Sequence, residues 1–124
     1  MNYFIIFLFL LLSCEKELPP NYTNVEFLKM GRVGDPQLKL ITPSDISQTL
    51  VDCNDYTPSC EYGLKVVVKN VTFKALNYKN QLDAKESATR MKGYVARNWV
   101  LDEVSGEPIL ERFVVKYLKA KKAL

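Results

Sequence analysis

Histidine is the most informative absence from this chain of 124 residues, which contains none. Without an imidazole, neither a Ser-His-Asp triad nor a Cys-His pair can form, and a frequent zinc ligand is also missing. An enzyme with this sequence would have to rely on carboxylates, lysine or tyrosine. We therefore predict a protein that is not an enzyme, with no catalytic residues, no metal and no other cofactor.

Strong net charge and long apolar runs are missing as well. The formal net charge is only +3, and a charge this small does not predict a nucleic-acid partner. The apolar run from Phe4 to Leu12 is about half of the roughly 20 residues that a transmembrane helix needs. Its length is typical of the hydrophobic region of a secretory signal, which spans about 7–15 residues.

The residues that end this run resemble the lipobox of bacterial lipoproteins. Leu11-Leu12-Ser13-Cys14 presents a leucine, a tolerated apolar residue, a small residue and a cysteine. The resemblance implies that residues 1–13 are a cleaved signal peptide and that Cys14 carries the lipid. No Lys or Arg precedes the run, and the alternatives are an ordinary signal peptide or a short uncleaved anchor. Glu15, where an Asp would favour the inner membrane, implies the outer membrane, facing the periplasm.

The rest of the chain has the length of one domain. Residues 14–24 are polar and contain Pro19-Pro20, so we expect the lipidated cysteine and a flexible tether there, and a single domain over 25–124. An exported pair of cysteines, Cys53 and Cys60, predicts a disulfide. Their spacing is not that of a redox-active C-x-x-C pair, which favours a structural bridge.

The first part of the domain is difficult to interpret. Residues 25–33 fit either a short strand or a helical turn, whereas 37–41 favour a short strand. Thr42-Pro43-Ser44-Asp45 has the features of a helix start, with Ile46 and Leu50 facing the core.

The second part shows clearer patterns. Apolar residues recur at even positions in 64–69 and at odd positions in 71–75. This change predicts either one strand with a bulge at 69–70 or two strands joined by a turn. A helix is expected over 81–92, because Asn80 can cap it, Gly93 can end it, and a narrow apolar stripe repeats along it. The stripe consists of Ala84, Ala88 and Met91.

A central strand, a turn and a final helix complete the chain. Residues 94–101 are apolar on both faces, as in a central strand, and the turn is expected over 102–107 around Ser105-Gly106. Pro108 suits the first turn of a helix. The apolar residues of this final helix follow helical spacing and are Leu110, Phe113, Val114, Tyr117 and Leu118.

The order strand, helix, strand, helix predicts an α+β fold, a small two-layer sandwich. A strand–helix–strand unit normally places its two strands parallel. The order is similar to that of ferredoxin-like proteins, as an analogy of element order alone.

Three groups of residues are candidates for function. Trp, Tyr and Arg are frequent at binding hot spots, so a partner surface is expected at the strand 94–101 and the disulfide loop. Its residues are Tyr56, Tyr62, Tyr94, Arg97 and Trp99. The alternative is that Trp99 belongs to the core and that Arg97 extends to the edge.

The other two groups are charged. Four carboxylates lie close in sequence, at Asp102, Glu103, Glu107 and Glu111. They fit a solvated turn better than a hydrolytic pair or a calcium site. The lysines after residue 115 either match the helix dipole or contact anionic lipid.

The sequence therefore predicts a lipid-anchored domain, facing the periplasm, that binds another envelope protein or component. The alternatives are a small carboxylate-dependent hydrolase and a structural or inhibitory envelope lipoprotein.

Overall fold

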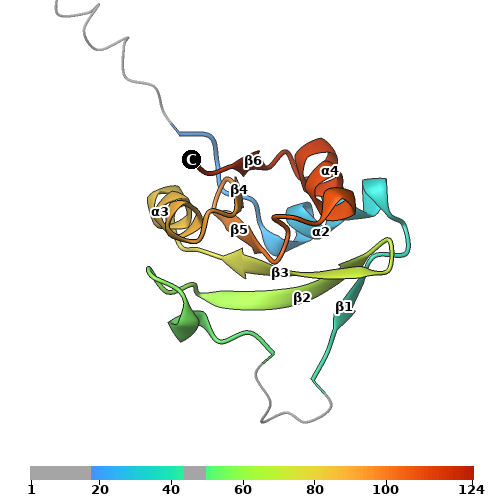
Figure 1. The fold of residues 1–124 in the computed structure, drawn as a ribbon, viewed down its shortest axis with the longest axis horizontal. Coiled ribbons are helices and arrows are strands. Elements are labelled where there is room, and N and C mark those ends of the chain that lie inside the picture. The colour runs from blue at the N-terminus through green and yellow to red at the C-terminus, as the bar shows by residue number, and fades with distance from the viewer. Residues whose placement is uncertain (1–17, 44–49) are drawn as a thin grey trace, which may run out of the picture.

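The computed structural model describes residues 18–43 and 50–124. In these ranges the chain forms three α-helices and one six-stranded antiparallel sheet with the order β1-β2-β3-β5-β4-β6 (Figure 1). The predicted α+β sandwich is confirmed. In chain order the elements are α2 (Asn24–Gly34), β1 (Lys39–Ile41), the 3-10 helix η1 (Cys53–Asp55), β2 (Tyr62–Val68), β3 (Val71–Asn77), α3 (Gln81–Met91), β4 (Tyr94–Ala96), β5 (Trp99–Asp102), α4 (Pro108–Tyr117) and β6 (Lys121–Lys122).

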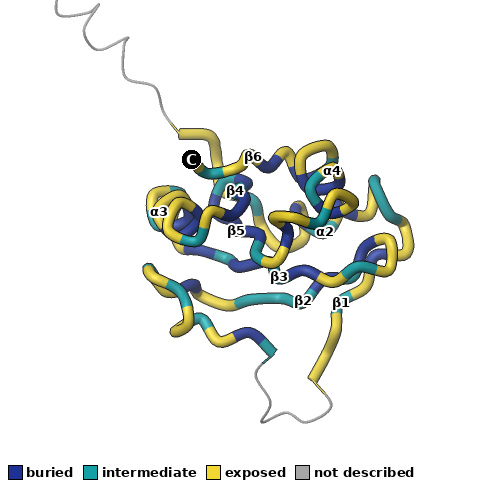
Figure 2. The backbone as a smooth tube through the Cα atoms, viewed as in Figure 1, coloured by how far each residue is buried: buried dark blue, intermediate teal, exposed yellow. Residues whose placement is uncertain are grey.

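Two apolar clusters occupy opposite faces of the central strands. Trp99 and Leu101 of β5 belong to the larger cluster, whereas Val100 between them belongs to the smaller one. Successive side chains of a strand point to opposite faces, so the sheet separates the clusters. Helices α2 and α4 cover the larger cluster, and α3 covers the smaller one from the other side of β4 and β5 (Figure 1). The buried backbone runs along β3, β5 and β4 between these helices (Figure 2).

The segment that fitted either a strand or a helical turn is helix α2. Thr23 is its N-cap, and the side chains of Thr23 and Glu26 form a reciprocal capping box. A capping box satisfies two backbone N–H groups that the helix leaves without partners. Phe27 and Gly31 face the core. Strand β1 lies within the predicted range 37–41, whereas the expected helix start at 42–45 extends beyond the described residues.

Strands β2 and β3 form a hairpin, so of the two predicted alternatives the two strands joined by a turn are confirmed and the single bulged strand is not. Lys69 and Asn70 both adopt positive φ, of 52° and 63°. Such a pair makes the tight turn whose twist matches that of two antiparallel strands. The hairpin pairs Val68 with Val71 and extends to Tyr62 opposite Asn77. The change in parity at residues 69–70 marks this turn.

The single central strand expected over 94–101 is also wrong. The chain turns at Arg97 and Asn98, so that β4 and β5 pair antiparallel with Ala96 opposite Trp99. Strand β5 also pairs antiparallel with β3. Strands β3 and β4, on either side of α3 in sequence, are therefore parallel with β5 between them. The predicted strand–helix–strand unit is therefore present as β3, α3 and β4, with strand β5 inserted between its two strands in the sheet.

The last two helices follow the sequence closely. The Asn80 side chain caps α3 by accepting a hydrogen bond from the backbone N–H of Asp83. The left-handed residue at the end of α3 is Lys92 rather than Gly93. Pro108 begins α4, and Leu110, Phe113 and Val114 are buried.

Candidate functional site

The turn between β4 and β5 holds the segment that leads into the domain. The carbonyl oxygen of Pro20 accepts a hydrogen bond of 2.7 Å from Arg97 Nη1. The Arg97 guanidinium also lies over the ring of Tyr22, 4.5 Å from its centroid. Nearby, Gln81 at the start of α3 donates to the carbonyl oxygen of Pro19. We call the side chains of Gln81, Arg97, Asn98 and Trp99 the N-terminal clamp.

Asn98 is the polar centre of the N-terminal clamp and is only 4% exposed. Its Oδ1 accepts a hydrogen bond of 2.9 Å from the backbone N–H of Tyr22, and its Nδ2 donates to the carbonyl oxygen of Tyr78 at 3.1 Å. The backbone N–H of Tyr78 donates in turn to the carbonyl oxygen of Asn98. Buried polar groups are costly without partners. This amide therefore fixes the entering segment to the domain.

Trp99 supplies the apolar part of the same contact. Its side chain is fully buried, and its ring stacks on Phe27 of α2 at a centroid distance of 4.2 Å. Its Nε1 donates a hydrogen bond of 3.0 Å to the carbonyl oxygen of Tyr22. The contacts of the described domain therefore include residues as far back as Pro19.

The structure does not bring the five predicted partner residues onto one surface. Trp99 and Tyr94 are buried, and Arg97 is bound to the entering segment. Tyr56 is half-buried on the other side of the sheet, and only Tyr62 is exposed, at 40%.

Two of these tyrosines are tied to carboxylates of their own domain. The Tyr56 hydroxyl donates a hydrogen bond of 2.6 Å to Asp102. Burial is the main cause that raises the pKa of Tyr56, and this bond adds to it. The Tyr94 hydroxyl donates to Glu111 at 2.6 Å, and this bond is the main cause that raises the pKa of Tyr94. A carboxylate acceptor and burial both favour the neutral phenol.

The four carboxylates are dispersed. Asp102 is the last residue of β5 and lies on the face of α3, whereas Glu111 bonds to Tyr94, whose side chain belongs to the opposite cluster. Glu103 forms an ion pair of 3.1 Å with Lys74, and Glu107 precedes α4 without a side-chain capping bond. Asp102 and Glu111 therefore do not form the facing pair that hydrolysis of a glycoside needs.

An apolar groove lies beside Tyr62 at the start of β2. Its volume is about 500 Å³, and it runs between the end of β1 and the residues that lead into the disulfide loop. Lining residues include Ile41, Leu50, Val51 and Leu64. Strand β1 pairs only with residues 65–67 of β2, so β1 does not cover the edge of β2 beside Tyr62.

The disulfide between Cys53 and Cys60 is present, as predicted. The loop that it closes packs on the sheet, where the carbonyl oxygen of Pro58 accepts a hydrogen bond of 2.9 Å from the hydroxyl of Tyr78. The Tyr78 oxygen also lies 2.6 Å from Oγ of the buried Ser87. The bridge therefore fixes one wall of the groove, because Cys53 lines it.

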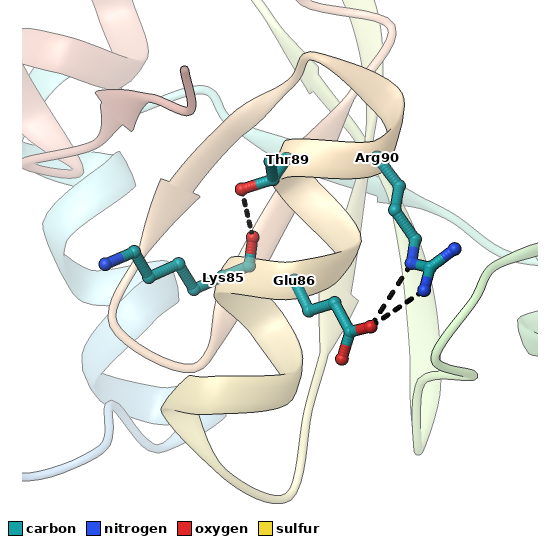
Figure 3. Close-up of polar contacts among 4 residues, drawn as sticks. All are labelled: Lys85, Glu86, Thr89 and Arg90. Atoms are coloured by element: carbon teal, nitrogen blue, oxygen red, sulfur yellow. Dashed lines mark hydrogen bonds and ion pairs between the residues drawn. The ribbon is translucent and has the colours of Figure 1, made fainter.

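The outer surface of α3 has a different character. Arg90 bonds to Glu86 one turn earlier, and the hydroxyl of Thr89 donates to the carbonyl oxygen of Lys85 (Figure 3). These polar groups satisfy one another within a single helix. Exposed pairs of this kind stabilise a helix only slightly, so this surface is typical of a solvated helix.

The C-terminal residues form a basic surface. From Arg112 onward the chain contains five basic residues and no acidic one. Lys119 Nζ donates to the carbonyl oxygen of Lys116, which matches the expected role of a lysine at a helix end. Lys121 and Lys122 in β6 are exposed and form no ion pair within the described residues.

The described residues contain no group of three or more acidic, Cys or His residues placed to hold a metal ion. In the same part of the chain, no helix has the length and apolar character to cross a bilayer. Comparison with protein-family models, curated proteins and solved structures gives no match.

Sequence reasoning missed Tyr22 and Asn98 as parts of one contact. They lie 76 positions apart, so no local pattern connects them. The available signal was the adjacent polar pair Arg97-Asn98 inside an apolar run, which is also the composition of a turn.

Proposed function

We propose that this protein is a lipid-anchored domain of the bacterial envelope that faces the periplasm and binds another envelope protein. The observation that carries the proposal is the sequence Leu11-Leu12-Ser13-Cys14 directly after the apolar run. Two lipid chains are enough for stable anchoring, because each buried methylene contributes about 0.8 kcal/mol.

The groove beside Tyr62 supports the binding part of the proposal. It combines apolar walls with an exposed aromatic ring at the edge of a sheet. Such an edge can accept an extended segment of a partner as an added strand, with apolar side chains in the neighbouring hollow. The groove also includes the one exposed member of the residues predicted for a partner surface.

The partner can be sought with a photoreactive amino acid at position 62 in cells that produce the full chain. Illumination should join this position to one specific envelope protein. Lys85 provides the matched control, because it is exposed on the solvated surface of α3 (Figure 3). The same probe at position 85 should give no such product.

The two positions are compared by whether each forms an adduct with the same envelope protein. An adduct at 62 that is absent at 85 supports the groove as the binding site. Equal adducts at both positions, or none at 62, would contradict it. The anchor is tested separately by Cys14→Ser, which should abolish incorporation of labelled fatty acid.

A further inference from the structure

The entering segment leaves the domain at a fixed place. Hydrogen bonds with the side chains of Gln81, Arg97, Asn98 and Trp99 hold the chain back as far as Pro19. Between Pro19 and Cys14 the chain has five residue steps, which span at most about 18 Å when fully extended. An anchor at Cys14 would therefore keep this side of the domain close to the lipid headgroups.

The basic residues lie on the same side. Strand β6, which carries Lys121 and Lys122, pairs with β4, and β4 leads directly into the turn that holds Pro20. Figure 1 shows β6, the C-terminus and the end of α4 on the side of the domain where the first described residues lie. The domain therefore presents its excess of positive charge where the anchor would place the membrane.

Three exposed lysines follow α4: Lys119 lies just after the helix, and Lys121 and Lys122 lie in β6. We define these three side chains as the C-terminal basic surface. Clustered basic side chains are attracted to anionic lipid headgroups.

We infer that the C-terminal basic surface docks on an anionic lipid surface, the membrane in which Cys14 is anchored. This inference rests on the proposed lipid anchor. Lysines near an anionic membrane gain about 1 kcal/mol each, which is about fivefold in the docked population for each side chain. Docking would fix the orientation of the domain and leave the groove at the opposite edge of the sheet open to a partner.

The test uses the full lipidated chain in lipid nanodiscs, either of phosphatidylcholine alone or with roughly one third phosphatidylglycerol. Lysine acetylation by a water-soluble reagent is followed by mass spectrometry. Lys121 and Lys122 should react at least about tenfold more slowly in the anionic discs, and about 0.5 M salt should remove the difference. Lys39, in β1 at the far edge of the sheet, should react equally in both.

A charge-reversal variant tests the same surface. In Lys121→Glu/Lys122→Glu the protection of Lys119 in anionic discs should be lost. The matched control Lys39→Glu/Lys65→Glu changes the net charge equally at the opposite edge and should retain that protection. Protection that is equally strong with the control and the test variant would overturn the inference.

The outcomes separate the two claims. If the wild-type chain stays on neutral discs but Lys121 and Lys122 react equally in both bilayers, docking is wrong and the anchor stands. If the chain does not associate with neutral discs, the anchor fails and the inference fails with it. Protection found in native membranes but not in anionic discs would identify a protein rather than lipid and would also overturn it.

Discussion

Replacing Asn98 by Ala should detach the entering segment and destabilise the domain. The substitution leaves the backbone N–H of Tyr22 and the carbonyl oxygen of Tyr78 without their partners, at sites where the Asn98 side chain is only 4% exposed. A buried polar group left unpaired costs about 1–3 kcal/mol. Tyr22 is half-buried, so water can replace part of its bond. We expect a loss of about 3 kcal/mol in total.

The assay is urea denaturation of the full chain in a mild detergent. Trp99 is the single tryptophan of the sequence, so its fluorescence reports on the clamp, and circular dichroism supplies an independent probe. The loss corresponds to a decrease in melting temperature of about 10 °C for a domain of this size. Cleavage by chymotrypsin after Tyr22 should accelerate roughly a hundredfold if the free energy of local opening falls by the same amount.

The control is Asn54→Ala, which removes an exposed amide side chain. Surface substitutions of this kind change stability by less than about 0.5 kcal/mol. If Asn98→Ala has an effect as small as Asn54→Ala and leaves cleavage after Tyr22 unchanged, the clamp does not hold the segment and the reasoning is refuted.

Three further perturbations follow from the structure. Cys53→Ser/Cys60→Ser should lower the free energy of unfolding by about 2.5 kcal/mol through the released loop, and an unchanged urea midpoint would contradict this. In Gly34→Ala the new Cβ would lie 2.3 Å from the ring of Tyr117, so we expect thermal denaturation to show a loss of about 1–3 kcal/mol in stability. In a Tyr117→Ala background the ring is absent, so Gly34→Ala should cost less there than in the wild type. An equal cost in both backgrounds would contradict the clash. The backbone N–H of Lys69 donates a hydrogen bond to the Asp35 carboxylate, and this bond holds the pKa of Asp35 below the usual 3.8. Its stabilising contribution is therefore complete above that pH and is lost as the pH falls through the lowered pKa. Asp35→Asn keeps an acceptor but does not titrate, so wild type and variant should converge in stability at low pH, whereas a difference independent of pH would contradict the assignment.

Local signals in the sequence predicted the elements that depend on local chemistry. Helix α3 begins after Asn80 and α4 begins at Pro108, as the capping preferences predict. The disulfide followed from the expectation that the pair of cysteines is exported, and their spacing favoured a structural bridge over a redox-active pair. These features depend on residues within a few positions of one another, so the sequence displays them directly.

The errors came from long-range contacts and from backbone conformation. The run 94–101 is apolar on both faces whether it forms one central strand or two short buried strands. The turn that separates them uses Arg97 at a φ of 56°, a conformation that glycine or asparagine adopts more readily. For Arg97 the compensation is the bond to Pro20 and the contact with Tyr22, partners that are distant in sequence.

The most direct test of the central claim is the mass of the N-terminal peptide from the mature protein, isolated from bacterial membranes. We predict a chain that begins at Cys14, with a diacylglycerol on its sulfur and an acyl chain on its amino group. A free thiol at Cys14, or a chain that begins at any other residue, would contradict it.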